Sequence, residues 1–313
     1  MTRVGFGVQI LVVVVLAATW VATASGAVLC QKRSGVLVIR SACKKKEALA
    51  DVAAVGLMGP KGDQGSPCMC PLASCPPDAV QVGTTCMDKY EASVWRVPAP
   101  TGINQGLVTK IQSGTATAAD LAFAGATQLG VGLTDDYAPC ADSGQNCTND
   151  VYAVSLPAVL PSANITWFQA QAACKNARKR LPSNAEWQAA VMGTPDPGPD
   201  NGSTDCRTKD GFAVATGSRS ACVSSDGAFD MVGNLLEWVA DWVPRSTVCG
   251  TWSAGVTPTG DYQCLGGAET TGEPGALLRG GNFHDGSSSG PLSILGKFEP
   301  SFAFDGFGLR CAR

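Results

Sequence analysis

The chain has 313 residues, 45% hydrophobic and 16% charged, a composition typical of a globular protein with a sizeable core. The formal charge of −3 hides an asymmetry, because residues 28–65 carry seven Lys/Arg against three Asp/Glu, whereas residues 66–313 carry fifteen against twenty-three. No basic stripe with an aromatic platform occurs, which excludes a nucleic-acid partner.

The first 27 residues have the pattern of a secretory signal peptide. Arg3 precedes an apolar run over residues 8–21, and small residues that suit a signal peptidase follow. This run is shorter than the ~20 residues needed to cross a bilayer, although an uncleaved anchor is the alternative. We expect a mature protein without a transmembrane segment that is secreted, periplasmic or held at the cell surface.

Two short segments precede the main domain, which we place at residues 78–313. Residues 28–55 hold two apolar runs around a turn, which predicts a small hairpin closed by a disulfide. In residues 56–77 glycine first recurs at every third position, as in collagen, and a stretch rich in cysteine and proline follows. Because so few triplets give a triple helix little stability, the alternative is that this segment is a semi-extended linker.

The chain has fourteen cysteines and one histidine. No CxxC spacing occurs, so disulfides are favoured over zinc, and the even count needs no free thiol in an exported protein. Neighbours in the sequence indicate four local pairs: Cys30 with Cys43, Cys140 with Cys147, Cys206 with Cys222, and Cys249 with Cys264. Cys68, Cys70, Cys75 and Cys86 form a further set of four.

Two helices carry clear start signals. Thr166 and Gln169 form a capping box that predicts a helix through about residue 178, and Ser183 with Glu186 predicts a second helix over 184–192. A short helix is possible at 118–124. Residues 97–163 are low in charge, and we expect loops there to carry a specific binding surface.

The stretch 226–242, DGAFDMVGNLLEWVADW, combines turn residues with large rings and acids. From Leu236 to Trp242 alternate residues are apolar, which predicts a half-buried strand with its large rings facing the core. Gly233 and Asn234 accept positive φ, so the chain can loop tightly between Asp230 and Glu237. Two carboxylates near backbone carbonyls are ligands that Ca²⁺ prefers, although a solvated acidic turn is the alternative.

Four motifs in order resemble the formylglycine-generating enzyme, or sulfatase-modifying factor, family. They are CMDKYEASVW at 86–95, ITWFQAQAACKNARKRLPSNAEWQAAV at 165–191, DMVGNLLEWVADW at 230–242, and LLRGGNF with GFGLRCAR within 277–313. The resemblance implies an α+β, loop-rich fold related to C-type lectins.

The resemblance also locates the family's catalytic positions. Active members hold copper(I) with two cysteines beyond the Gly-Gly dipeptide, and Asp285 and Gly290 occupy those positions here. No cysteine occurs between residues 280 and 300, so we expect neither copper nor the family's oxidase chemistry. His284, the only histidine, lies beside Asp285, but no nucleophile motif accompanies it. A single histidine is also too few for an ergothioneine-type sulfoxide synthase, another enzymatic relative.

Two further features are implied by the resemblance alone. It assigns calcium ligands to the carboxylates of Asp230 and Glu237 and to the carbonyls of Gly233 and Leu235. It also implies a disulfide between Cys174 and Cys311.

The sequence therefore predicts an exported, non-catalytic binding or surface module, stabilised by calcium, on a sulfatase-modifying-factor scaffold. Its ligand would be a protein or a glycan. The alternative is a formylglycine-generating oxidase, or a related oxidoreductase, with a rearranged site.

Overall fold

The computed structural model describes residues 28–34, 37–50, 74–131, 136–196, 200–209, 211–253, 255–256 and 260–313. By its internal contacts the chain divides into two units, residues 1–70 and 71–313. The expected signal peptide, the collagen-like tract, Cys68 and Cys70 lie outside the described residues.

The N-terminal unit is a small antiparallel sheet with the strand order β2-β1-β3. The strands are β1 (Val28–Lys32), β2 (Leu37–Arg40) and β3 (Glu47–Leu49). A disulfide joins Cys30 to Cys43, and Cys30 is fully buried. The hairpin expected from the sequence is present, and a third strand, not expected, completes the sheet.

The larger unit is built around a six-stranded sheet with the order β10-β11-β13-β12-β9-β14. Most neighbouring strands are antiparallel, but β11 runs parallel to β13, and β14 runs parallel to β9. The strands are β9 (Leu236–Val243), β10 (Val248–Thr251), β11 (Tyr262–Gly266), β12 (Gly275–Arg279), β13 (Ile294–Phe298) and β14 (Phe307–Leu309).

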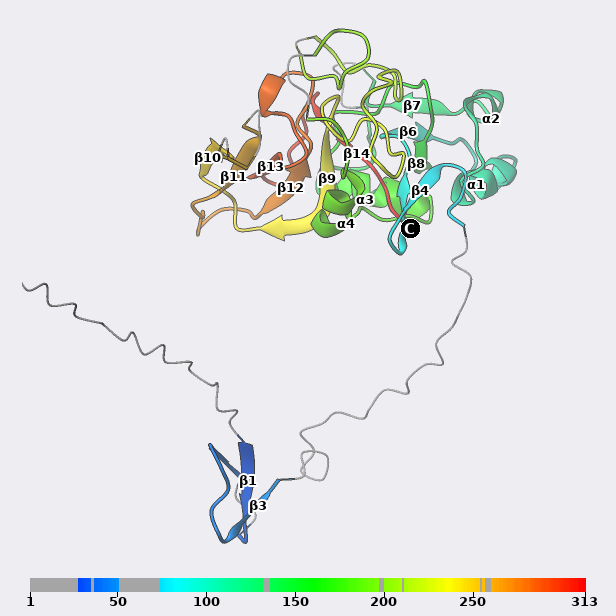
Figure 1. The fold of residues 1–313 in the computed structure, drawn as a ribbon. Coiled ribbons are helices and arrows are strands. Elements are labelled where there is room, and N and C mark those ends of the chain that lie inside the picture. Colours follow the sequence, from blue (N-terminus) through cyan, green and yellow to red (C-terminus); the bar gives the residue numbers. More distant parts are fainter. Residues whose placement is uncertain are drawn as a thin grey trace, which may run out of the picture. The chain divides into compact units, whose positions relative to one another are not determined.

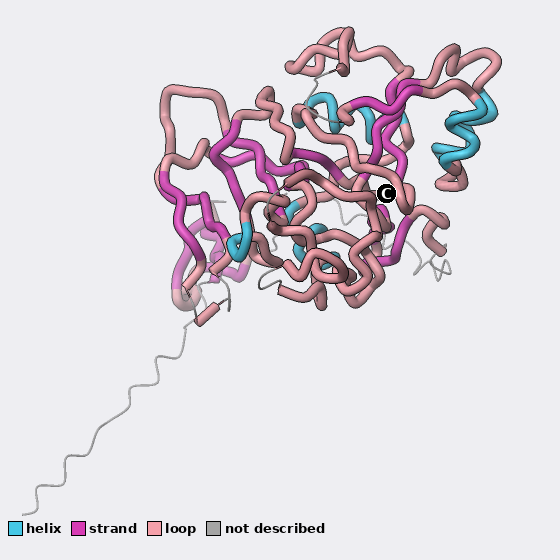
Figure 2. The backbone as a smooth tube through the Cα atoms, turned by 90° about the horizontal axis from the view of Figure 1, so that it is seen from above, coloured by secondary structure: helices cyan, strands magenta, loops and turns pink. Residues whose placement is uncertain are grey.

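Two smaller sheets complete the β-structure of this unit. One pairs β6 (Ala92–Arg96) with β7 (Thr127–Leu129) and β8 (Val151–Ser155), and the other pairs β4 (Ala79–Val82) with β5 (Thr85–Asp88). The three-stranded and six-stranded sheets lie toward opposite sides of the unit, and long loops connect the elements (Figures 1 and 2). The predicted α+β, loop-rich architecture is confirmed.

Within the described residues, four short α-helices and one 3₁₀ turn accompany the sheets. They are α1 (Gln105–Gln112), α2 (Ala118–Phe123), α3 (Trp167–Asn176), α4 (Asn184–Ala190) and the turn Gly286–Ser288. Complete capping boxes start α3 and α4, at Thr166 and Ser183 as predicted, whereas α1 was not expected. No helix in the described part of the chain is long and apolar enough to cross a bilayer.

The predicted alternation along β9 is wrong. All four residues from Leu236 to Val239 are buried, whereas Ala240 and Trp242 are exposed. In the first half of β9, Leu236 and Trp238 belong to the core cluster that contains Cys174, whereas Val239 belongs to a second cluster with Trp187 of α4, so both faces of the strand are covered. Trp242 lies outside that cover, 43% exposed, and makes edge contacts with Trp167 and Phe168.

One core cluster connects the two larger sheets with α3. It includes Val94 on β6, Trp238 on β9 and Phe307 on β14, together with Cys174 and Cys311. Six disulfides occur in the described residues: Cys30–Cys43, Cys75–Cys86, Cys140–Cys147, Cys174–Cys311, Cys206–Cys222 and Cys249–Cys264. Cys174–Cys311 closes the longest loop, with a separation of 137 residues.

Replacing Cys174 and Cys311 together with alanine should lower the free energy of unfolding by about 5 kcal/mol on the chain-entropy model. Replacing Cys140 and Cys147, which are only seven residues apart, should lower it by about 2 kcal/mol. Urea denaturation without reductant measures both. Equal losses for the two double variants would contradict loop length as the cause.

Glu186 stabilises the start of α4 in its ionised form. Its carboxylate accepts hydrogen bonds from both Arg180 Nη atoms, from the Ser183 backbone and side chain, and from Thr85 Oγ1. The Arg180 bonds contribute most to lowering the pKa of Glu186 from its ordinary 4.5 to about 2. The ionised carboxylate therefore adds stability above pH 4.5 that disappears as the pH falls through about 2.

We expect Glu186→Gln to destabilise the protein at neutral pH and to lose most of that effect near pH 2, where the natural carboxylate is largely protonated. Denaturant titrations across this range measure the difference between the two proteins. Glu273→Gln is a matched control because Glu273 is exposed and its carboxylate accepts only from the Ser301 hydroxyl. A Glu186→Gln deficit that is the same at both pH values would show that the charge is unimportant.

Candidate functional site

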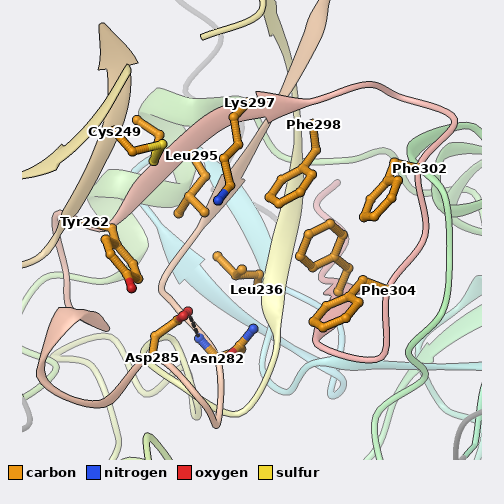
Figure 3. Close-up of a pocket in the computed structure, with 12 residues that line it drawn as sticks. Leu236, Cys249, Tyr262, Asn282, Asp285, Leu295, Lys297, Phe298, Phe302 and Phe304 are labelled. Carbon is orange, nitrogen blue, oxygen red and sulfur yellow. Dashed lines mark hydrogen bonds between the residues drawn. A yellow bond between two sulfur atoms is a disulfide. The ribbon is translucent and has the colours of Figure 1, made fainter. Parts of the chain in front are cut away.

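A pocket of about 480 Å³ lies on the six-stranded sheet and is the candidate site. Strands β9, β11, β13 and β14 contribute to its lining, with the segments 282–285 and 299–306 and the Cys249–Cys264 disulfide beside it (Figure 3). Leu236 and Leu295 form apolar parts of the lining, and none of the lining residues comes from 97–163, where the sequence led us to expect a binding surface.

Four phenylalanines form one wall of the pocket (Figure 3). The Phe298 and Phe302 rings stack with centroids 5.1 Å apart, and Phe304 packs edge-on against Phe307 at 5.5 Å. Phe298 ends β13 and Phe307 begins β14, so the connecting loop places Phe302 and Phe304 between them. Phe302 and Phe304 remain 36% and 43% exposed, which leaves their rings accessible to a ligand.

Polar side chains lie on the other sides of the same pocket. Asp285 and Asn282 form a tight turn, in which Asn282 N donates to Asp285 Oδ2 (2.9 Å) and Asp285 N donates to Asn282 O (3.2 Å). Tyr262 and Lys297 reach in from β11 and β13 (Figure 3). Burial raises the pKa of Asp285, while the Asn282 N–H, Lys297 and His284 act in the opposite direction.

The pocket therefore pairs an aromatic wall with a partly desolvated carboxylate and an ammonium group. A ligand with an apolar ring face and polar substituents could contact the phenylalanines with one side and Asp285 with the other. His284 is exposed and does not line the pocket, so it is no catalytic partner for Asp285 there.

Gly290, the second of the two family positions, has no room for a side chain. A Cβ atom at Gly290 would lie 2.1 Å from Asp261 Oδ1 and 2.3 Å from Asp261 Cγ. Asp261 is fully buried and its Oδ2 accepts from Leu292 N at 2.7 Å, so it is held in place. A thiolate at 290 would require the Asp261 carboxylate, next to the start of β11, to move. With a carboxylate at 285 as the other donor, these residues do not fit copper(I).

The structure brings the predicted calcium residues into one buried turn behind the pocket. Asp230, Gly233 and Asn234 adopt positive φ, which bends the chain between Asp230 and Glu237. Asp230 Oδ2 accepts from Gly217 N at 2.7 Å. Glu237 Oε2 accepts from Trp187 Nε1 at 2.7 Å, and Glu237 Oε1 accepts from Arg310 Nη2 at 2.8 Å.

The Glu237 carboxylate is thus already engaged by two buried donors, Trp187 and Arg310. A calcium ion at Glu237 would share the carboxylate with the Arg310 guanidinium, whose charge opposes the ion. No three acidic, histidine or cysteine side chains of the described residues are grouped for a metal. As they lie, the four residues form no open calcium cage, and calcium binding stays a prediction.

Carboxylates nevertheless outnumber cations in this turn. Glu91 is buried and accepts from Leu235 N at 2.9 Å and from the Asn234 side chain. Burial, together with the charges of Asp230 and Glu237, raises the pKa of Glu91 well above its ordinary value. Burial also raises the pKa of Asp230 to about 6.

The acidic turn supports the pocket through backbone hydrogen bonds. Gly233 N donates to Gly280 O, and Phe283 N donates to Asn234 O at 3.1 Å. Leu236 N donates to Gly306 O at 2.8 Å, next to the loop that carries Phe302 and Phe304. The turn that the sequence singled out therefore fixes both the Asn282–Asp285 turn and the aromatic loop.

Sequence reasoning missed most of the pocket lining. Tyr262, Lys297 and the phenylalanines at 298, 302 and 304 were not identified. The close spacing of phenylalanines in KFEPSFAFDGF was the available signal. It has no regular helical or strand period, so it indicates a site only when the loop conformation is known.

The sequence model of the sulfatase-modifying factor enzyme 1-like domain matches residues 110–313. This range contains all of the pocket and the acidic turn. No curated protein matches the chain.

Solved structures with similar folds include the P3c variant of the major tropism determinant, which is 20% identical with a TM-score of 0.41. The match covers 76% of this chain and 52% of that one, so the chain spans about half the length of that protein. PvdO from Pseudomonas aeruginosa is 18% identical with a TM-score of 0.38, and the match covers 77% of this chain and 89% of PvdO. CarF is 14% identical with a TM-score of 0.35, and the match covers 73% of this chain and 85% of CarF.

Glu237→Gln distinguishes two roles of the acidic turn, the ion pair with Arg310 and the predicted binding of calcium. It leaves the Arg310 guanidinium buried without its ion-pair partner, so the free energy of unfolding should fall by about 3–5 kcal/mol, even in EDTA. If calcium is bound by the four predicted residues, EDTA should lower the melting temperature of the natural protein but not of Glu237→Gln.

Asp226→Asn is the control for that experiment because Asp226 is an exposed acid of the same stretch. Identical melting curves of the natural protein with and without EDTA would remove the calcium site. A loss under 1 kcal/mol for Glu237→Gln in EDTA would contradict the ion-pair role.

Proposed function

The chain belongs to the sulfatase-modifying factor enzyme 1-like family, and from that premise we propose that it is an exported, non-catalytic binding module. Its ligand, a protein or a glycan, places a ring or an apolar side chain in the pocket between Asp285 and the phenylalanine wall. One observation carries this proposal: the family's two cysteine positions hold a carboxylate at the pocket and a glycine packed against Asp261.

The oxidase chemistry of active members depends on two thiolates that hold copper(I). Asp285 offers a hard oxygen donor, and Gly290 offers none. All twelve cysteines among the described residues are paired in disulfides, so none of them is a thiolate that could replace the missing ligands. The arrangement favours binding over oxidation.

The pocket has the chemistry of a recognition site. Two partly exposed rings, Phe302 and Phe304, offer apolar area that a ligand can cover. Among the described residues the Asp285 carboxylate accepts one hydrogen bond, from the Asn282 N–H, so it can accept further hydrogen bonds from a ligand hydroxyl, amide or amine. Lys297 can bind an acidic or carbonyl group at the opposite side.

Export is supported by the disulfides. Six bridges persist only where the compartment is oxidising, such as the periplasm or the outside of the cell. Together with the signal pattern of residues 1–27, they favour a secreted, periplasmic or surface location. Calcium at the acidic turn would add stability to the scaffold without entering the pocket.

The test is a screen of the whole protein against a glycan array and a peptide library, followed by affinity measurements on the ligand found. Phe302→Ala and Phe304→Ala should each weaken binding about tenfold, because each removes apolar contact area worth ~1–2 kcal/mol. Asp285→Asn should weaken a ligand that donates to the carboxylate. Phe123→Ala is the matched control, since Phe123 lies outside the pocket and is 96% exposed.

A cysteine-containing sulfatase peptide, incubated with the protein, copper(I) and oxygen, should keep its mass. Formylglycine in the mass spectrum would overturn the non-catalytic proposal. An affinity that falls equally for Phe302→Ala and Phe123→Ala would place the ligand elsewhere.

A further inference from the structure

A second candidate site lies in the N-terminal unit and shares no lining residue with the pocket. Strands β1 and β3 are antiparallel with Lys32 opposite Glu47, so the residues after β1 and those before β3 meet at one end of the sheet. A hollow of about 510 Å³ opens there, and Lys32, Arg33, Lys45 and Lys46 line it. All four side chains are exposed.

The one carboxylate of this hollow is already neutralised. Glu47 Oε2 accepts from Arg40 Nε at 2.9 Å and from Lys44 N at 3.1 Å, and Glu47 Oε1 accepts from Arg40 Nη2 at 3.0 Å. Its side chain is only 7% exposed. The Lys44 and Arg40 hydrogen bonds lower the pKa of Glu47, so it stays ionised and held by these donors.

The four cations of the hollow form no ion pair within the described residues of the unit. Like charges gathered at one concave surface repel each other and attract mobile anions. Residues 66–313 carry the opposite balance, fifteen Lys/Arg against twenty-three Asp/Glu, so attraction to a polyanion is concentrated in the N-terminal unit.

We propose that this basic hollow binds a linear anionic polysaccharide. A sugar chain carrying sulfate or carboxylate groups can enter a concavity and present one anion to each side of it. A flat bilayer cannot follow a concave surface, and to anchor in lipid this unit has no aromatic residue between 28 and 50 and no helix in the part of that range that the structure describes. The same absence of aromatic rings leaves no stacking platform for the bases of a single-stranded nucleic acid.

Lys45 and Lys46 are the residues to replace because both line the hollow and both are exposed. Within the described residues, neither side chain makes a hydrogen bond. The control is Lys175→Ala with Lys209→Ala, which takes the same charge from exposed positions of the larger unit. Both double variants should melt at the temperature of the natural protein. Any difference in binding then reports the position of the charge.

The experiment measures binding of the whole protein to heparin, a linear sulfated polysaccharide, over a series of salt concentrations. Lys45→Ala/Lys46→Ala should weaken binding about tenfold at low salt and flatten the dependence of affinity on salt, while the control pair changes affinity less than about twofold. Neutral dextran should not bind.

Three results would overturn the proposal. The first is no retention of the natural protein on heparin at low salt. The second is an equal loss for the two double variants, which would indicate diffuse charge attraction. The third is binding to vesicles of phosphatidylglycerol and phosphatidylcholine that is tighter than binding to heparin, which would make the hollow's partner a lipid surface. The pocket variants Phe302→Ala and Phe304→Ala should leave heparin binding unchanged, so failure here is separate from failure of the proposed pocket function.

Discussion

The buried guanidinium of Arg310 is the contact on which the larger unit depends. It is fully buried and donates to both oxygens of Glu237 on β9, to Asp88 O at the end of β5, and to Phe229 O before the acidic turn. One side chain near the C-terminus thus connects three segments that are far apart in the sequence. Because an unpaired buried charge is costly, removing either partner of the Arg310–Glu237 pair should loosen all of these segments together.

The pocket depends on this ion pair through the strands that carry it. Leu236 precedes Glu237 on β9 and lines the pocket, and Phe307 on β14 lines it three residues before Arg310. Adjacent side chains of a strand point to opposite faces, so β9 presents Leu236 to the ligand side and Glu237 to the buried charges. The charged cluster therefore acts as a rigid support, and the side chains available to a ligand come from β11, β13, β14 and the loops 282–285 and 299–306.

The chain has the family scaffold, and the sequence resemblance assigns Asp285 and Gly290 to the positions of the family's two copper-binding cysteines. A carboxylate at 285 is compatible with the pocket because its turn with Asn282 supplies a hydrogen bond, and a glycine is required at 290 because only hydrogen fits against Asp261. On that assignment, the place of a soft metal in active members is in this chain a polar corner beside an aromatic wall. The N-terminal unit adds an opposite charge preference, so the two units offer different surfaces to different chemical groups.

The sequence by itself determined the features that depend on neighbouring residues. The capping boxes at Thr166 and Ser183 fixed where two helices begin. The absence of cysteine at 280–300, visible in the sequence, was enough to predict that the family's copper chemistry is missing. Motif order identified the family, and short separations indicated the local cysteine pairs. Tertiary structure decided the rest, because it depends on contacts between distant segments: the burial of both faces of β9, the capture of Glu237 by Arg310 across 73 residues, and a pocket assembled from separate strands and loops. No local period encodes such contacts, since a side chain's partner across the fold is set by the path of the whole chain.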